Sequence, residues 1–438
     1  MNVRRLFSLL FTGLVCSIIG LGLYSFVKDM HPPEIVLTPN TDRISPQREL
    51  TLRLTDQSGI RSVSVQIRKN NQIQTIVERH FTEKRQTEEV RFDLKNASLR
   101  EGAFDLEIKA TDASWAGFGR GNTRTLTLPM RLDTQPPRVS MKHAPPHVRR
   151  GGCGAVLYSV NKAVQYSGVR VGEHFFPGYR QEDDTYFCIF AFPLSFEAKQ
   201  YNPQLVVEDV AGNTSINRLA VVPVTINFRR DAINITDNFL QAKMPELQHL
   251  TPNAATPLEQ YLGINRDVRV ANEKTLLSLK AKTSDAMLWS GPFIHMPRAA
   301  ERARFGDFRT YMYQGQKIDE QTHMGLDLAS LPHADIPAAN DGVVIFTEFL
   351  GIYGNAVVVD HGQGLMSLYS HLSKTGVSVG DVVRKGEILG QTGTTGLAVG
   401  DHLHFGMLMQ GLEVQPLEWL DPRWIRDNIA GRMKTPTR

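Results

Sequence analysis

The chain has 438 residues, of which 41% are hydrophobic and 21% are charged. This composition is that of a globular protein with room for roughly three domains, and it excludes a disordered chain. The net charge of +4 is slight, no basic cluster interleaved with aromatic residues points to nucleic acid, and three cysteines are too few for a disulfide scaffold.

Residues 1–30 are predicted to form a short cytoplasmic stub and a transmembrane helix. Arg4 and Arg5 precede a run without charge from Leu6 to Val27, and about 20 apolar residues suffice to cross the hydrocarbon core. Arginines before the run predict a cytoplasmic amino terminus and an exported remainder. The alternative is a cleaved signal peptide, whose apolar core would be only about 7–15 residues long.

Two stretches, residues 31–132 and 133–228, are predicted to be tandem immunoglobulin-like β-sandwiches. Short runs in both alternate between apolar and polar residues, with Gly, Asn, Asp and Pro between the runs. Pro-Pro-Glu-Ile-Val at 32–36 returns as Pro-Pro-Arg-Val-Ser at 136–140. This repetition predicts two related domains and a mainly β fold.

Cys153 and Cys188 are the only cysteines of the second stretch. In an exported domain they can form a disulfide, which would stabilise the fold by ~2–4 kcal/mol, although the sequence does not fix their distance. Mass spectrometry without reduction would show two free thiols there if this prediction is wrong.

Residues 229–290 change to helical spacing and are predicted to be a helical connector. Thr-Pro-Leu-Glu at 256–259 is a capping box with proline at the first helical position, and Gly263 can close that short helix. A longer apolar-periodic stretch, roughly Glu273 to Met287, predicts a second helix. The connector either packs on the following domain as a structural element or lies over its groove as an inhibitory segment.

Residues 291–427 are predicted to be the last domain, followed by a solvated tail over 428–438. Trp419, Trp424 and Ile425 are predicted to pack back on this domain. Within it, the run from Gln321 to Ala329 alternates as a half-buried strand does, which puts His323 and Asp327 on one face. Only a glycine separates these two side chains on that face, so the space between them is open.

Two further segments of the domain carry histidines on strand-like runs. In the run 400–406 the side chains of His402 and His404 share one face, while Leu403 and Phe405 take the buried one. The run 368–372 adds His371. Imidazole and carboxylate are ligands that zinc prefers, so four histidines and one aspartate on three segments predict a metal site.

An H-x-x-x-D strand, a Tyr-Ser-His-Leu segment and a late H-x-H resemble the LytM/lysostaphin-type zinc metallo-endopeptidases. Further matching motifs follow in order, among them Phe305-Gly306 and the runs 338–344, 351–355, 358–362 and 377–390. The resemblance covers about Gly291 to Asp421, less than a third of the chain. It departs at Asp401, where the more familiar pattern has proline. An extra carboxylate there can tune the basicity of the site or its substrate preference, and it removes no ligand.

The resemblance implies one Zn²⁺ per chain, with His323, Asp327 and His404 as ligands. It also implies that His371 and His402 are catalytic, beside the open corner of the zinc tetrahedron. A zinc-bound water has a pKa lowered toward ~7, and a neighbouring imidazole would take its proton. Spacing alone shows only that His402 and His404 face one way. The remaining histidines of the domain, His295, His333 and His361, are expected to be structural.

The function implied by the resemblance is hydrolysis of peptide bonds in peptidoglycan stem or cross-link peptides. With the predicted anchor, the enzyme would be a single-pass protein of the inner membrane with its bulk in the periplasm. The immunoglobulin-like domains would act as spacers, or bind the wall polymer or cell-envelope proteins. One alternative is a non-enzymatic LytM-like regulator that activates cell-wall amidases, although such regulators have lost ligands that are present in this chain. Another is a structural tether with a vestigial peptidase domain.

Overall fold

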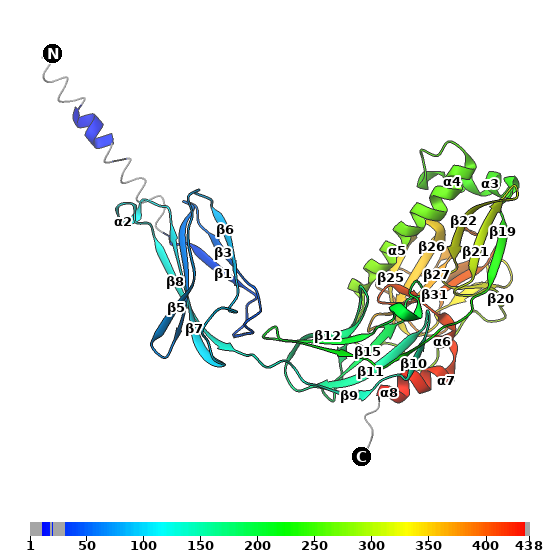
Figure 1. Cartoon of the computed structure of the whole chain (residues 1–438). Helices are drawn as coiled ribbons and strands as arrows, with labels where there is room; N and C mark the ends of the chain where they lie inside the picture. Colours follow the sequence, from blue (N-terminus) through cyan, green and yellow to red (C-terminus); the bar gives the residue numbers. More distant parts are fainter. Residues whose placement is uncertain (1–10, 18–19, 21–30, 434–438) are drawn as a thin grey trace, which may run out of the picture. The chain divides into compact units, whose positions relative to one another are not determined.

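The computed structural model describes residues 11–17, residue 20 and residues 31–433 (Figure 1). The predicted transmembrane run, Leu6 to Val27, lies mostly outside these residues. Among the helices that the structure describes, none is long and apolar enough to cross a membrane. The prediction of a mainly β fold is confirmed. The chain divides into two compact units, the first made of Met1–Arg138, Lys162–Gln165 and Glu208–Ser215 and the second of the remainder.

The first unit contains two sheets over one hydrophobic core. One sheet has the order β1 (Glu34–Thr38), β3 (Leu50–Thr55), β6 (Thr87–Phe92), and the other β2 (Arg43–Ile44), β8 (Thr123–Leu132), β7 (Gly102–Asp112), β4 (Ile60–Lys69), β5 (Gln72–His80). A four-residue element, α2 (Ala116–Gly119), lies between β7 and β8. Leu50, Leu52 and Leu54 alternate into the core from β3, as the period of two requires. The immunoglobulin-like assignment stays a prediction.

The second predicted sandwich also has two main sheets. Their orders are β14 (Tyr179–Arg180), β15 (Thr185–Ala191), β11 (Cys153–Val160), β9 (Val139–His143), and β13 (His174–Pro177), β12 (Val164–Val171), β16 (Gln204–Asp209), β17 (Thr214–Arg218). A short parallel pair joins β10 (His147–Arg149) to β18 (Val222–Val224), and a 3-10 turn, η1, spans Ala198–Gln200.

The predicted disulfide is wrong, because Cys153 and Cys188 are both free and buried. They lie on neighbouring strands, but Cys153 is opposite Ala191 and Cys188 is opposite Val156. This offset of three positions turns the two side chains to opposite faces of the sheet. Burial raises the pKa of the Cys188 thiol to about 12, so it is an unreactive core residue.

The predicted connector begins with a strand and continues as helices. In order they are β19 (Arg230–Asn234), α3 (Asp237–Lys243), η2 (Met244–Leu250), α4 (Pro257–Gly263), η3 (Ile264–Val268), α5 (Arg269–Ser278) and η4 (Leu279–Lys282). The predicted cap is present, because the Thr256 side chain accepts a hydrogen bond from the Glu259 amide. The α-helix α4 ends at Gly263, as predicted, but the Gly263 backbone is helical and the chain continues through η3 into α5.

The second predicted helix, Glu273 to Met287, is displaced in the structure. It begins earlier, at Arg269, and its helical turns end at Lys282. The reason lies at Asp360, whose carboxylate accepts hydrogen bonds from the Thr283 hydroxyl at 2.7 Å and the Ser284 amide at 2.8 Å. These bonds tie the chain to the sheet and stop the helix. Because Asp360 is far away in the sequence, helical periodicity could not indicate this end.

The C-terminal domain is built on an eight-stranded sheet. Its order is β20 (Ala300–Ala303), β23 (Leu326–Ala329), β31 (Leu403–Met409), β27 (Leu365–Ser370), β26 (Asn355–Asp360), β25 (Gly342–Phe349), β29 (Val382–Val383), with β32 (Leu412–Val414) also paired to β31. Two three-stranded sheets flank it, β19 with β21 (Phe308–Tyr313) and β22 (Gln316–Thr322), and β24 (Asp335–Pro337) with β30 (Ile388–Thr392) and β28 (Leu372–Thr375). A 3-10 turn, η5, spans Gly351–Tyr353.

The connector packs on one face of the large sheet (Figure 1). Met366, Leu368 and Leu408 point from that face into a core shared with the connector helices. Because residues two apart on a strand share a face, His404 lies on the same side as Leu408. The sheet therefore presents the histidines and the connector on one face.

At its C-terminal end the chain packs back as predicted at Trp419, which meets the rings of Trp289 and Phe293, while the last helical turns lie against β11. This end contains α6 (Pro416–Leu420), α7 (Pro422–Trp424), η6 (Ile425–Ala430) and α8 (Gly431–Met433). Trp419 is fully buried and meets the Trp424 ring edge-on at 5.2 Å, and Ile425 is buried. Ile429 is buried as well, so the packed part extends beyond the predicted boundary at residue 427.

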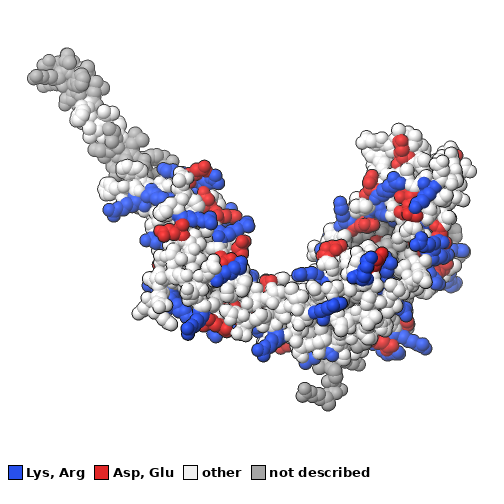
Figure 2. Space-filling view, in the orientation of Figure 1, with Lys and Arg blue, Asp and Glu red and all other residues white. Residues whose placement is uncertain are grey.

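Acidic and basic side chains are interspersed on the face of each unit that Figure 2 shows. Among the described residues on that face, no broad region carries one sign of charge. This mixed surface agrees with the slight net charge of +4.

Candidate metal centre

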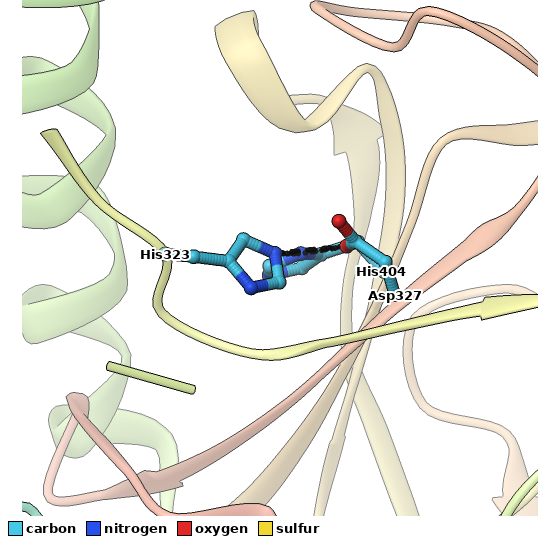
Figure 3. A group of neighbouring side chains, drawn as sticks. All are labelled: His323, Asp327 and His404. Atoms are coloured by element: carbon cyan, nitrogen blue, oxygen red, sulfur yellow. Dashed lines mark hydrogen bonds and ion pairs between the residues drawn. The ribbon is translucent and has the colours of Figure 1, made fainter. Parts of the chain in front are cut away.

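Three potential ligand atoms converge beside β23 and β31 of the large sheet (Figure 3). Nε2 of His323 lies 2.8 Å from Oδ1 of Asp327 and 3.0 Å from Nδ1 of His404, and that Nδ1 lies 3.0 Å from the same carboxylate oxygen. Asp327 and His404 are directly opposite each other in the ladder of β23 and β31. The antiparallel pairing therefore joins two segments that are remote in sequence.

The predicted continuous strand from Gln321 to Ala329 is interrupted at His323. β22 ends at Thr322 and β23 begins at Leu326, and the His323 backbone bonds to Asp307 and Gly306 across the break. Gly325 is required there, because a Cβ on it would lie 2.6 Å from Nε2 of His404. The glycine thus keeps room for the imidazole, as the sequence predicted.

The donor atoms of this group fit a zinc ion. Nδ1 of His323 faces the Arg304 carbonyl at 3.0 Å, and a carbonyl only accepts, so Nδ1 carries the proton and Nε2 keeps a lone pair. Nδ1 of His404 is the ring nitrogen that faces the other two ligand atoms. Its Nε2 is buried without a hydrogen-bond partner among the described residues. Two imidazole nitrogens and one carboxylate oxygen are a donor set typical of a catalytic zinc site with an open corner.

His371 and His402 lie beside this group, with ring centroids 4.8 Å apart. Nδ1 of His371 donates to the Thr395 carbonyl at 2.8 Å, and Nδ1 of His402 donates to the Gly400 carbonyl at 2.7 Å. Both therefore keep Nε2 available to accept a proton. The backbone of His371 has a φ of 65°, an uncommon left-handed conformation that tends to be retained at functional sites.

The two histidines differ in basicity. Burial, followed by the charges of His402 and His404, holds the pKa of His371 well below its usual value. Burial would also lower the pKa of His402, but the negative charge of the neighbouring Asp327 carboxylate raises it overall. Nε2 of His402 lies 3.6 Å from Oδ1 of Asp327. Two neighbouring groups with opposite shifts are typical of acid–base sites.

Arg309 belongs to the site but was not predicted. Its Nη2 donates to Oδ2 of Asp327 at 3.1 Å, the oxygen that is turned away from the two histidines. Burial would raise the pKa of Asp327, but the charge of His323 and the neighbouring rings of His402 and His404 hold it well below the usual range. A clue in the sequence was a charged residue in the alternating run Phe308 to Tyr313, just after Phe305-Gly306.

Asp401 lines the groove but directs its carboxylate to a neighbouring loop. It accepts hydrogen bonds from the Thr392 hydroxyl at 2.5 Å and the His333 amide at 3.2 Å. These bonds hold the loop that precedes His402. Its predicted effect on the basicity of the site stays a prediction.

The histidines that were expected to be structural have structural partners. His361 is fully buried, with Nδ1 bonded to the Asp341 carbonyl and Nε2 to the Ser367 hydroxyl. Nδ1 of His295 faces the Met296 carbonyl, and Nδ1 of His333 faces the Ser373 hydroxyl. Within residues 31–433, the potential metal group contains only His323, Asp327 and His404.

The family model described as Peptidase family M23 matches residues 321–416, which include all five predicted site residues. This stretch is an M23 peptidase domain of the LytM/lysostaphin type.

Three curated relatives show how far the similarity extends. DD-carboxypeptidase/endopeptidase Mpg of Neisseria meningitidis is 40% identical over 95 residues, which are 22% of each chain. Peptidoglycan DD-endopeptidase ShyA of Vibrio cholerae is 36% identical over 96 residues, again 22% of each chain. Murein hydrolase activator EnvC of Escherichia coli is 36% identical over 110 residues, 25% of this chain and 26% of that relative. The chain thus spans about a quarter or less of the length of these relatives.

Proposed function

We propose that the chain is a zinc metallo-endopeptidase that hydrolyses peptide bonds in peptidoglycan stem or cross-link peptides. The observation that carries the proposal is the complete group of His323, Asp327 and His404 with two further imidazoles beside it. All five line one groove of about 370 Å³. The names of Mpg and ShyA, which match this domain, support a peptidase acting on the cell wall.

Zinc held by His323, Asp327 and His404 would act as a Lewis acid and bring the pKa of a water toward ~7. Nε2 of His402 takes the proton of the attacking water. Nε2 of His371 accepts a hydrogen bond from that water and orients it. Once protonated, an imidazole N–H can donate to the oxygen that becomes negative as the amide carbon turns tetrahedral.

We further propose that the protein is anchored in the inner membrane by residues 6–27, with its bulk in the periplasm. The uncharged run after Arg4 and Arg5 supports this placement. A reporter fused after Arg438 should be active only outside the cytoplasm, and the chain should stay with membranes after a high-salt wash. Release of a shortened soluble form would contradict the anchor.

The enzymatic proposal is tested with the zinc-loaded fragment from His31 onward and purified wall material. Mass analysis should find products that differ from the substrate by the water added at a peptide bond. EnvC supports a second function, activation of another hydrolase. A regulator would release no product alone but would increase release by an added amidase, so the same assay distinguishes the two.

A further inference from the structure

A second cavity, of about 850 Å³, lies next to the metal groove. Its walls come from the second sandwich at 194–195, the segment 226–230, helix α5, and the turn between β31 and β32. Arg269 and Met324 line both this cavity and the metal groove. Because the two spaces share these lining residues, they lie side by side, so one arm of a substrate held at the metal group would be within reach of the second cavity.

Three arginines line this cavity, Arg150, Arg230 and Arg269. Within residues 31–433, none of the three forms an ion pair with a carboxylate. Nε of Arg150 donates to the Leu194 carbonyl at 2.8 Å, which leaves its terminal nitrogens for another acceptor. The Arg230 guanidinium lies 5.0 Å from the centre of the Phe308 ring, an arrangement that orients it by cation–π attraction.

Arg269 is fixed in the wall between the two spaces. Its Nε and Nη2 donate to the backbone and side-chain oxygens of Asn265 at 3.1 and 2.7 Å. A guanidinium has five donor hydrogens, so donors remain for a ligand. Its position is therefore set before any ligand binds.

The acidic side chains of the lining do not cancel this charge. Glu413 is buried and accepts a hydrogen bond from the Tyr353 hydroxyl at 2.6 Å. Burial raises its pKa to about 7, so it is only partly charged at neutral pH. Glu273 is exposed on α5. The three arginines are always charged, whereas the lining has at most two charged carboxylates, so the net charge of the cavity lining is positive.

We propose that this cavity binds a carboxylate-bearing arm of the peptide whose scissile bond lies in the metal groove. Guanidinium groups pair with carboxylates through two parallel hydrogen bonds, and Phe228, Phe308 and Leu277 provide apolar walls for the aliphatic part of the arm. The proposal rests on the proposed function, since a peptidoglycan stem or cross-link peptide is the substrate class assigned there, and the carboxylate of its bound arm is what this inference adds. It adds the second sandwich to the substrate-binding surface.

The test uses the full-length, zinc-loaded chain with a defined cross-linked peptide dimer and the same dimer with its carboxylates amidated. In the variant Arg150→Gln/Arg230→Gln, KM for the free-acid dimer should rise ~10–100-fold, the value of one or two charge-assisted hydrogen bonds. Its kcat and zinc content should not change. For the amidated dimer, KM should be similarly high in the wild type and in the double variant, because neither protein can then form the arginine–carboxylate pairs.

Arg218→Gln/Arg423→Gln is the matched control, because it removes two exposed arginines that do not line the cavity. An equal rise in KM in the control, or an equal rise for both dimers, would overturn the proposal. If the wild-type chain cleaves neither dimer, calorimetry separates the two hypotheses. If the double variant binds the free-acid dimer more weakly than the wild type does, and the amidated dimer equally well, the proposed binding site is retained and the enzymatic function is rejected. If both proteins bind the free-acid dimer equally well, the proposed binding site is rejected.

Discussion

His402 and His404 share one strand face, yet the structure gives them different surroundings. Only His404 reaches the metal group, so His323→Ala, Asp327→Ala and His404→Ala should each lower the zinc content sharply. His371→Ala and His402→Ala should keep nearly stoichiometric zinc and lose ~10²–10⁴-fold in turnover, the usual size of an acid–base contribution. The zinc content, measured by elemental analysis, and the rate of wall-peptide cleavage are compared for all five variants.

Two outcomes would change this assignment. Loss of zinc from His402→Ala, with zinc retained in His404→Ala, would reverse the roles of the pair. Unchanged wall-peptide cleavage in all five variants would remove the enzymatic function and favour the regulator.

Arg309 should support the metal group without binding the metal. Its bond to Oδ2 fixes the Asp327 carboxylate, which without it could rotate. Loss of such a supporting contact typically costs 10–100-fold in metal affinity, so we expect Arg309→Met to weaken zinc binding by about that factor in a chelator competition. Arg302→Met, an exposed residue of the same groove, is the control. Equal zinc affinities in the two variants would contradict the role of Arg309.

At the scale of elements, the connector is part of the domain core. Its buried side chains in the shared cluster are Ile235, Leu240, Met244, Leu247, Tyr261, Ile264, Leu276 and Leu279. Each is worth ~1.5–3 kcal/mol of burial, so together they contribute roughly 12–24 kcal/mol before the cost of ordering the chain, which is comparable with or larger than the usual net stability of a domain, about 5–15 kcal/mol. Nζ of Lys243 also bonds to the Thr394 carbonyl at 2.5 Å, in the loop that holds His371.

The connector should therefore be required for folding. A fragment that starts near Gly291 should lack a cooperative melting transition and activity, whereas one that starts near Phe228 should keep its fold. Thermal melting followed by circular dichroism, then wall-peptide cleavage, checks both fragments. A folded Gly291 fragment that cleaves faster would instead show that the segment is inhibitory.

Local patterns in the sequence were enough to predict the candidate ligands and catalytic histidines, but not the contacts with distant segments that surround them. Alternation around His323 and His404 indicated which side chains share a face, because a strand repeats every two residues. It could not show that Arg309 meets Asp327 or that Asp360 stops the helix at Lys282, since both depend on pairings between distant segments. The disulfide prediction failed for the same reason, because it required the register of β11 and β15.

At the scale of the molecule, Glu418 joins the second sandwich to the peptidase domain. Its Oε2 accepts a hydrogen bond from the Cys153 amide at 2.8 Å, and burial raises its pKa from 4.5 to about 7. The native state therefore holds a proton that the unfolded chain releases near the ordinary glutamate pKa of 4.5. The contribution of this group to the free energy of unfolding is fully present below that pH. It falls by about 3 kcal/mol as the pH rises to about 7.

Glu418→Gln keeps an acceptor oxygen but cannot ionise. The free energy of unfolding of the wild type should fall relative to this variant between about pH 4.5 and 7, as measured by denaturant titration at several pH values. Glu348→Gln, at an exposed position of β25, should follow the wild type. Parallel curves for wild type and Glu418→Gln would exclude a role of Glu418 in the pH dependence.

The direct pairing of Asp327 with His404 has a consequence for the life of the protein in the cell. The two residues are 77 positions apart in the chain, so an ion held by both would act as a reversible cross-link between distant strands. A cross-link that closes a loop of this length lowers the entropy of the unfolded chain by an amount worth about 4 kcal/mol. Without zinc, β23 and β31 would open more often and expose the chain to proteolysis. Zinc supply would therefore set the abundance of the protein as well as its activity.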